Sequence, residues 1–298
     1  MNKILKNVAQ IAKQKKSCKA ILTAYKKVLR QQFSYMYISK ILEVRMEICM
    51  AVNFENFVEK SESVCKEILR KKNYYTDKEW MKNHVIFRLI AKEGSENFLE
   101  NTPHIMIADL LVVFYLLLEQ KEDYIASTRI SYSLLEYMEL QEDQLFALAE
   151  HNCRCYFPMY FAPITETICH FHGNTEDRFV FHGGYADELQ RQKQFLCSVI
   201  RREDDTPFFV LTNAQGINGA ACLLYGAVLP QLAQIFDSDF YVVPSSIHEV
   251  LILPCDTLGS VDLNQMVQEV NKSMLKKTEV LSAHVYRYDK ELGKLLAN

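Results

Sequence analysis

The sequence predicts an α+β protein with a helical N-terminal region, a mixed central region and a C-terminal split-βαβ-like lobe. Three observations predict this class. Apolar residues recur every three or four positions over residues 3–30, which is the spacing of an amphipathic helix. In the last third of the chain, short aromatic or β-branched runs alternate with helical periodicity. The 298 residues are 49% hydrophobic and 24% charged, the balance of a globular chain with a sizeable core.

We expect three regions along the chain: a basic helical extension over 1–49, a helical and mixed α/β region over 50–200, and a C-terminal β-α-β-β-α-β lobe over 201–298. Residues 1–42 contain ten Lys or Arg and no acid, so with a net charge of −3 the remaining residues carry −13 (−3 − 10). Such a basic segment can bind nucleic acid or an acidic surface, or be the solvated face of a helix. Without a recognised binding motif, nucleic acid is a possible but disfavoured partner.

Two features indicate a chain that stays in the cytoplasm and does not enter a membrane. The longest apolar run, 110–118, is far shorter than the roughly 20 residues of a membrane-spanning helix. The lysine-rich start has no apolar block or cleavage site, so it is not a secretory signal. The nine cysteines are an odd number and favour free thiols over a disulfide framework.

The first two thirds of the chain read as helices followed by a small sheet and another helix. Residues 31–72 continue the helical spacing with breaks near Asn53 and Ser61. Short aromatic and β-branched segments predict strands over 84–90, 110–118 and 126–133, although the continuous apolar run 110–118 also fits a helix segment. A run with an acidic first turn then predicts a helix over 141–152, because acidic residues suit the positive end of the helix dipole.

The C-terminal lobe has the clearest pattern. A strand over 208–211 precedes helical spacing from Cys222 to Phe236, in which Pro230 should either kink the helix or begin a second one. The six residues 244–249 can join strands at 240–243 and 250–253 into a hairpin. A helix starting near Asp262 and a strand over 284–288 complete the order. We therefore expect four antiparallel strands with both helices on one face.

The hairpin connection gathers hydroxyls, an imidazole and a carboxylate, namely Ser245, Ser246, His248 and Glu249. A serine needs a nearby base to lose its proton, and an imidazole needs an acceptor to orient it, so these residue types suit a hydrolase or ligand-processing enzyme. The same residues also cap turns through bonds to the backbone, and that interpretation is favoured. Side chains of 245–249 that serve as backbone caps would argue against the enzyme.

A second group of side chains could hold a metal ion. His151 and His182 accompany the weak candidates Cys153, Cys155, Cys169, His170 and His172. Cysteine and histidine are the usual zinc ligands. However, the first pair is Cys-x-Cys and not Cys-x₂-Cys, and bulky aromatic residues separate the pairs, so core packing is the favoured interpretation. We therefore predict no metal and no other cofactor.

Three shorter features favour ordinary structural roles. The segment 212–219 lacks both phosphate-loop signatures, so it reads as a turn before a helix, with Asn218 as a possible cap. Glycines beside His172 and His182 suggest turns around a short strand at 178–181. Arg287, between two tyrosines, could stack on a ligand, although pairing with a carboxylate such as Asp289 is more usual.

Several linked segments resemble the bacterial domain of unknown function 5688 family. They are residues 83–90, 101–104, 109–115, 219–225, 244–251 and 282–289. The resemblance spans about residues 50–290, and Met50 to Phe57 looks like the usual beginning of a member, which makes residues 1–49 look like an extension. It implies no known activity. With no catalytic constellation favoured over its structural interpretation, we expect a non-enzymatic cytoplasmic protein that binds another protein or a small molecule.

Overall fold

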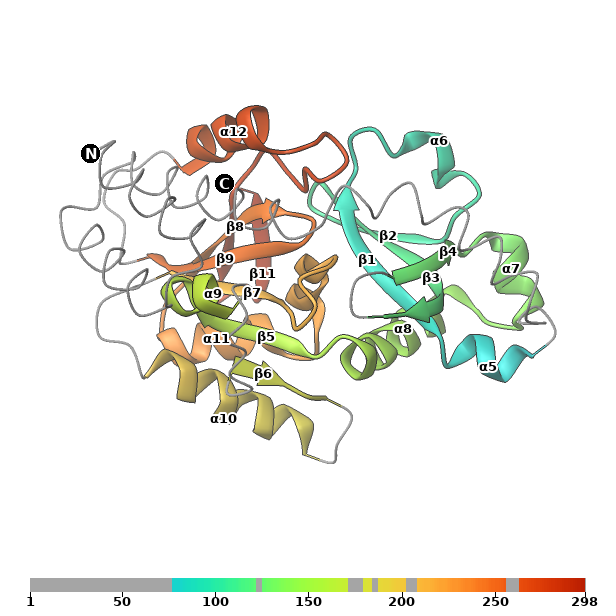
Figure 1. Cartoon of the computed structure of the whole chain (residues 1–298), viewed down its shortest axis with the longest axis horizontal. Coiled ribbons are helices and arrows are strands. Elements are labelled where there is room, and N and C mark those ends of the chain that lie inside the picture. Colours follow the sequence, from blue (N-terminus) through green and yellow to red (C-terminus); the bar gives the residue numbers. More distant parts are fainter. Residues whose placement is uncertain are drawn as a thin grey trace.

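A computed structural model describes residues 77–121, 125–170, 179–183, 187–201, 208–255 and 263–297, without the side chains of 168–170 and 274. The helices and extension expected within residues 1–72, the turn at 172–174 and Asp262 lie outside these ranges. The described residues form helices and two antiparallel sheets (Figure 1). The predicted α+β class is therefore confirmed.

The first sheet has four strands arranged around one long strand. The strands are β1 (Val85–Ala91), β2 (His104–Ile107), β3 (Leu110–Gln120) and β4 (Ile125–Arg129). β3 pairs antiparallel with each of the other three, and it is the apolar run that the sequence assigns to the core. The third predicted strand is shorter than expected, because Ser131 accepts a hydrogen bond from the Leu134 amide and begins helix α7 (Tyr132–Tyr137).

Helix α8 (Glu142–Tyr156) confirms the helix predicted over 141–152 and covers the first sheet. Gln141 and Gln144 form a capping box, and Glu142 and Asp143 supply the acidic first turn. Asn152 attaches the helix to β1, because its amide donates to the Val85 carbonyl at 2.9 Å. Two short helices, α5 (Lys78–Lys82) and α6 (Glu96–Leu99), lie at the margins of this sheet (Figure 1).

The second sheet has seven strands in the order β11-β10-β8-β9-β7-β5-β6. These strands are β5 (Met159–Pro163), β6 (Val180–Phe181), β7 (Phe209–Asn213), β8 (Phe240–Ser246), β9 (Glu249–Pro254), β10 (Tyr286–Asp289) and β11 (Lys294–Ala297). β9 lies between β7 and β8, which is the expected split arrangement. The sheet also takes β5 and β6 from before residue 200, so it extends across the point at which we expected the C-terminal lobe to begin.

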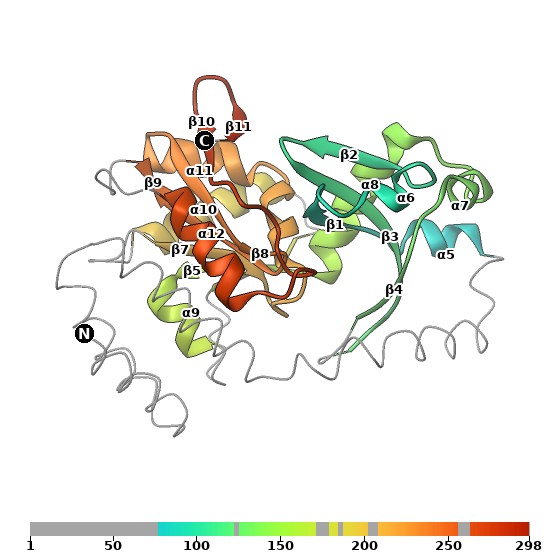
Figure 2. The ribbon, with the colours of Figure 1, turned by 90° about the horizontal axis from the view of Figure 1, so that it is seen from above.

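Helices cover both faces of the second sheet, and the expectation that they share one face is wrong. They are α9 (Ile164–His170), α10 (Glu188–Ile200), α11 (Val228–Phe236) and α12 (Leu263–Met274). Figure 2 shows α9 and α12 on one side and α10 and α11 on the other. The reason is visible in β8 and β9, whose apolar residues run continuously and do not alternate with polar ones, as in strands buried on both faces.

Pro230 begins a second helix, which is one of the two outcomes expected for it. The helical spacing from Cys222 to Phe236 is divided between a 3-10 helix, η2 (Gly219–Leu224), and α11. The break lies at Gly226, whose φ is +50°. Pro230 is the third residue of α11, in the first turn, where the backbone amide has no partner within the helix and its loss costs little.

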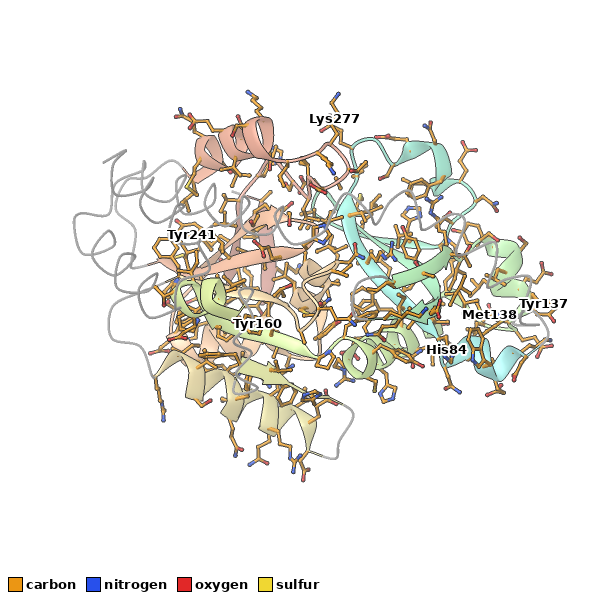
Figure 3. The ribbon with its side chains drawn as sticks, in the orientation of Figure 1. His84, Tyr137, Met138, Tyr160, Tyr241 and Lys277 are labelled. Carbon is orange, nitrogen blue, oxygen red and sulfur yellow. The ribbon has the colours of Figure 1, made fainter. Side chains whose placement is uncertain are left out.

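The two sheets meet along a junction made by loops from distant parts of the chain. Among them are the turn between β8 and β9, the loop before η2 and the loop of residues 275–285, in which Lys277 is labelled in Figure 3. The amide of Ile247, in the turn, donates to the carbonyl of Glu279 in that loop at 2.9 Å. No described helix is long and apolar enough to cross a membrane.

Candidate functional site

The four residues proposed for catalysis lie where β8 turns into β9, but the turn is shorter than expected. Only Ile247 and His248 lie between the strands, so Ser245 and Ser246 end β8 and Glu249 begins β9. The register shifts between Pro244 and Ser246, and a bulge of this kind is a usual place for proline in a sheet. The expected six-residue connection is therefore a two-residue turn with its polar neighbours inside the strands.

Both serine hydroxyls have structural partners at this turn. The Ser245 hydroxyl donates to Glu249 Oε1 at 3.0 Å, and both residues are buried. The Ser246 hydroxyl accepts a hydrogen bond from the backbone amide of His248 at 3.0 Å, which is a turn cap. Within the described part of the chain, neither hydroxyl bonds to the imidazole. This geometry lacks the contact between nucleophile and base that a serine mechanism requires.

The His248 imidazole already uses the lone pair that a general base would need. Its Nδ1 accepts a hydrogen bond from the Asn218 amide at 3.1 Å. Burial lowers the pKa of His248 to about 4, and the positive charge of Arg88 on β1 acts in the same direction. The ring is therefore neutral at pH 7, and a neutral ring that accepts at Nδ1 carries its proton on Nε2. In this tautomer the ring holds the backbone of Asn218 through its Nδ1 atom.

We expect the replacement His248→Asn to flatten the dependence of stability on pH. The folded-state pKa lies below the unfolded value of 6.5, so the unfolded chain binds more protons between these values. Stability is thus present in full above pH 6.5 and declines as pH falls toward 4. Urea midpoints at pH 7.5 and pH 5 measure this slope. The exposed His182 provides a matched control, His182→Asn, which should keep the wild-type slope. Equal slopes in all three proteins would contradict the prediction.

The turn is held against the end of β7 and the start of η2 by several contacts at close range. The Thr212 hydroxyl donates to the His248 carbonyl at 2.7 Å, and the Ala220 amide donates to the Ile247 carbonyl at 3.2 Å. Gly219 lies between these bonds, where a Cβ atom would come within 2.5 Å of the His248 carbonyl oxygen. We call Thr212, Gly219, Ala220, Ile247 and His248 the turn clamp. It requires glycine because two backbone segments approach there.

Asn213, and not Asn218, organises the loop before η2. The Asn213 side chain donates to the Ile217 carbonyl at 2.7 Å and accepts from the Gln215 amide at 3.1 Å. Asn218 makes no side-chain cap and instead takes a left-handed φ of +53°, so its expected capping role is wrong. Asparagine tolerates this conformation better than most residues. The segment is a turn, as the sequence indicates.

A small cavity lies beside the clamp, between the two sheets. Arg88, Asn213 and Asn218 supply its polar lining, and apolar residues from both sheets complete it. Its volume is about 10 Å³, which is close to the room that one water molecule needs. A metabolite of ordinary size requires several hundred Å³. This cavity can hold a water molecule but not a substrate.

The described metal candidates lie in different surroundings. Cys153 is buried, its Sγ accepts from the Phe87 amide at 3.3 Å, and burial raises the pKa of the thiol to about 12. Cys155 is exposed, with its Sγ 3.9 Å from His151 Nε2, and partial burial followed by the charge of Glu188 raises its pKa. Metals bind the thiolate, which both environments disfavour. No three possible ligands gather within the described residues. The side chains of Cys169, His170 and His172 lie outside them.

A polar cluster to which the sequence assigned no role joins the two sheets at Asp109, in the turn from β2 to β3. Its Oδ2 accepts from the Ser282 hydroxyl at 2.9 Å and contacts His284 Nδ1 at 3.2 Å, and its Oδ1 accepts from the Tyr286 hydroxyl. Partial burial acts to raise the pKa of Asp109, but the bonds from Tyr286, His284 and Ser282 outweigh it and hold the pKa below its usual value. We call these four residues the Asp109 latch.

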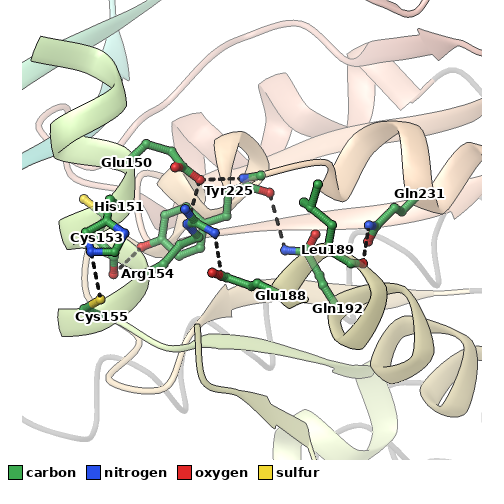
Figure 4. A network of polar contacts seen from close by, with 11 residues as sticks. Glu150, His151, Cys153, Arg154, Cys155, Glu188, Leu189, Gln192, Tyr225 and Gln231 are labelled. Carbon is green, nitrogen blue, oxygen red and sulfur yellow. Dashed lines mark hydrogen bonds and ion pairs between the residues drawn. The ribbon is translucent and has the colours of Figure 1, made fainter. Parts of the chain in front are cut away.

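A second unanticipated network connects the helices of the two sheets (Figure 4). Arg154 on α8 pairs with Glu150 at 2.8 Å on its own helix and with Glu188 on α10 at 2.6 Å. Glu150 also accepts the Gly226 amide at 2.7 Å. All three charged side chains are at most 16% exposed, and paired charges of this kind hold elements in place. The i,i+4 spacing of Glu150 and Arg154 is the one signal in the sequence.

These observations define an α+β protein of two antiparallel sheets, joined by partly buried polar contacts at their junction. The chain belongs to DUF5688, a family of unknown function, whose model matches residues 10–290. The predicted family is thus confirmed. The match begins at residue 10 and not near Met50, so residues 10–49 fall within the family region and the idea that they are added to it is corrected. No curated protein and no solved structure matches the chain.

Proposed function

We propose that this protein acts by binding another protein and not by catalysis. The observation that carries the proposal is the way in which the polar residues of the β8–β9 turn are used. His248 accepts a backbone amide, and Ser246 caps the turn beside it. The side chains best suited to chemistry in this sequence are thereby engaged in holding the fold. When the potentially reactive side chains hold the fold, the exposed surface is what remains for interaction, and this suits a protein that binds another protein.

The alternative is a hydrolase or ligand-processing enzyme that uses His248, Glu249 and either Ser245 or Ser246. It requires a serine hydroxyl within hydrogen-bond reach of the imidazole. The Ser245 hydroxyl is 1% exposed and donates to Glu249, and the adjacent cavity is about the size of one water. These features weigh against access of a substrate to either hydroxyl.

A fluorophosphonate probe distinguishes the two functions, because it labels only serines that are activated as nucleophiles. We expect no labelling of Ser245 or Ser246 when the intact protein is incubated with the probe and analysed by peptide mass spectrometry. A known serine hydrolase added to the same sample confirms that the probe is active. Labelling of either serine that disappears in His248→Asn would overturn the binding proposal in favour of the enzyme.

The setting we propose is the bacterial cytoplasm. Five described cysteines, at positions 153, 155, 197, 222 and 255, are free thiols, the state maintained in a reducing compartment. The second alternative, nucleic-acid association through the basic residues 1–42, concerns a segment outside the described residues. Retention on DNA or RNA that weakens steeply with salt would favour that alternative over a protein partner.

A further inference from the structure

The outer edge of the first sheet presents an unusual strand. β2 lies at the end of the order β1-β3-β2, and among the described strands it pairs only with β3 (Figure 2). Alternate amide and carbonyl groups of an edge strand point away from its neighbour and can pair with another chain. β2 therefore offers main-chain donors and acceptors along one side.

The side chains of β2 leave this edge unprotected. Its sequence from His104 to Ile107 contains no charged residue and no proline, which are the usual means of blocking an edge. Ile105 is 38% exposed and Met106 is 60% exposed. Because successive residues of a strand point to opposite faces, apolar surface is available on both sides of the strand. The edge is thus apolar on both faces.

The strand is also held in a fixed position. Its register with β3 is regular over all four residues, and the turn that follows contains Asp109. The Asp109 latch attaches this turn to Ser282, His284 and Tyr286 near β10. A strand that is ordered before binding loses little conformational entropy when a partner adds to it.

We propose that the edge of β2 is a docking site for an extended, uncharged apolar segment of a partner protein, which adds to the first sheet as an antiparallel strand. This inference rests on the proposed binding function. The absence of charge in β2 favours an uncharged partner segment, and the exposed side chains on both faces favour alternating apolar residues.

The size of the edge distinguishes such a segment from a second copy of this chain. A stable protein interface uses roughly 20–30 residues on each side, whereas β2 has four. Two copies paired only through β2 would therefore fall far short of a stable dimer. A linear segment needs only main-chain bonds and two or three side-chain contacts, which β2 can supply.

The test uses the full chain and a fluorescein-labelled peptide of sequence KTVIVTK, followed by fluorescence anisotropy. The segment TVIVT of this peptide is uncharged, and the terminal lysines serve only to keep it in solution. We expect saturable binding that Met106→Lys weakens by about tenfold or more, equivalent to about 1.4 kcal/mol. Leu292→Lys is the matched control, because Leu292 is 62% exposed on the turn between β10 and β11 and should leave binding unchanged. A peptide N-methylated at its central residue loses a main-chain donor and should fail to bind.

A second measurement locates the site and separates the possible failures. Hydrogen exchange of residues 104–107 should slow when the peptide is added. Absence of binding at millimolar peptide, or equal binding by Met106→Lys, would overturn the docking site. Dimerisation abolished by Met106→Lys in sedimentation would replace the peptide with a second copy. The proposed non-enzymatic function fails separately, through fluorophosphonate labelling, so the two outcomes cannot be confused.

Discussion

Replacing Gly219 with alanine should destabilise the protein by about 3 kcal/mol or more, the upper range for inserting an atom into a packed interior. The new Cβ would lie 2.0 Å from Thr212 Oγ1, 2.5 Å from the His248 carbonyl oxygen and 2.6 Å from the Asn213 amide nitrogen. Two of these atoms belong to backbone and cannot rotate away. The clamp must therefore open, and its hydrogen bonds are lost with it. Urea denaturation followed by circular dichroism measures the change.

Gly94→Ala provides the comparison for this substitution. Gly94 has a φ of +80°, but no atom lies within 4 Å of the position that its Cβ would occupy. Its cost should be only the backbone strain of about 1–2 kcal/mol. If Gly219→Ala is no more destabilising than Gly94→Ala, then the loop before η2 moves away from the β8–β9 turn without cost, and the clamp does not stabilise the junction.

Asp109→Asn should weaken the junction by about 2 kcal/mol at pH 7, within the range for hydrogen bonds to a charged acceptor. The asparagine side chain has one neutral oxygen to accept hydrogen bonds, whereas the aspartate has a charged carboxylate with two. The amide nitrogen of the asparagine would also face the hydroxyl of Ser282 or Tyr286. Tyr286 suffers most, because its side chain is 1% exposed and cannot turn to solvent. Denaturation midpoints report the loss, and Tyr286→Phe should reproduce part of it.

The same substitution should also change the response to acid. The pKa of Asp109 is lower in the folded protein than its ordinary value of 3.8, so the carboxylate contributes stability above that value. The contribution is lost as pH falls through the folded-state pKa. Asp109→Asn should therefore lose less stability than wild type between pH 5 and pH 2. Glu93→Gln is the control, since this carboxylate is exposed and lies outside the latch. Identical acid profiles for wild type and Asp109→Asn would refute the role of the latch.

Local sequence patterns predicted a helix or strand correctly where the residues of that element alone favour its secondary structure. α8 was predicted because its first turn is acidic and its apolar residues keep helical spacing. The continuous apolar run of β3 placed it in the core but fitted a helix as well as a strand. The hairpin of β8 and β9 was predicted too, but with a longer connection, because proline and serine usually mark turns. Here Ser245 and Glu249 bond to one another, and burial within the strands costs little.

Long-range arrangement could not be predicted in the same way. Whether α11 and α12 share a face of the sheet depends on connections between strands, and periodicity within each helix is the same in both cases. The Asp109 latch joins residues 173 to 177 positions apart, so no local motif contains it. The residues of the latch do lie in segments on which the family resemblance rests. Nothing in those separate segments indicates that Asp109 and Ser282 would meet.

For the candidate site too, the sequence identified the residues but not their long-range partners. The sequence identified Ser245, Ser246, His248 and Glu249 as the best group to test, and it favoured turn capping over catalysis. For His248, the structure adds the groups that decide its role, which are the Asn218 amide in the loop before η2 and the charge of Arg88 on β1. The pKa of His248 depends on burial under that loop and on Arg88, neither of which adjoins it in sequence.

The separation of Asp109 from Ser282 has a consequence during synthesis. A ribosome adds roughly 5–20 residues per second, so Ser282, which lies 173 positions after Asp109, appears about 9 to 35 s later. Through that interval the Asp109 carboxylate lacks the partners that it has in the finished fold. The turn from β2 to β3 then lacks its attachment, and the apolar edge beside it is held only by β3. The turn from β2 to β3, and with it the position of the β2 edge, is therefore fixed only when the last segment of the chain has been made.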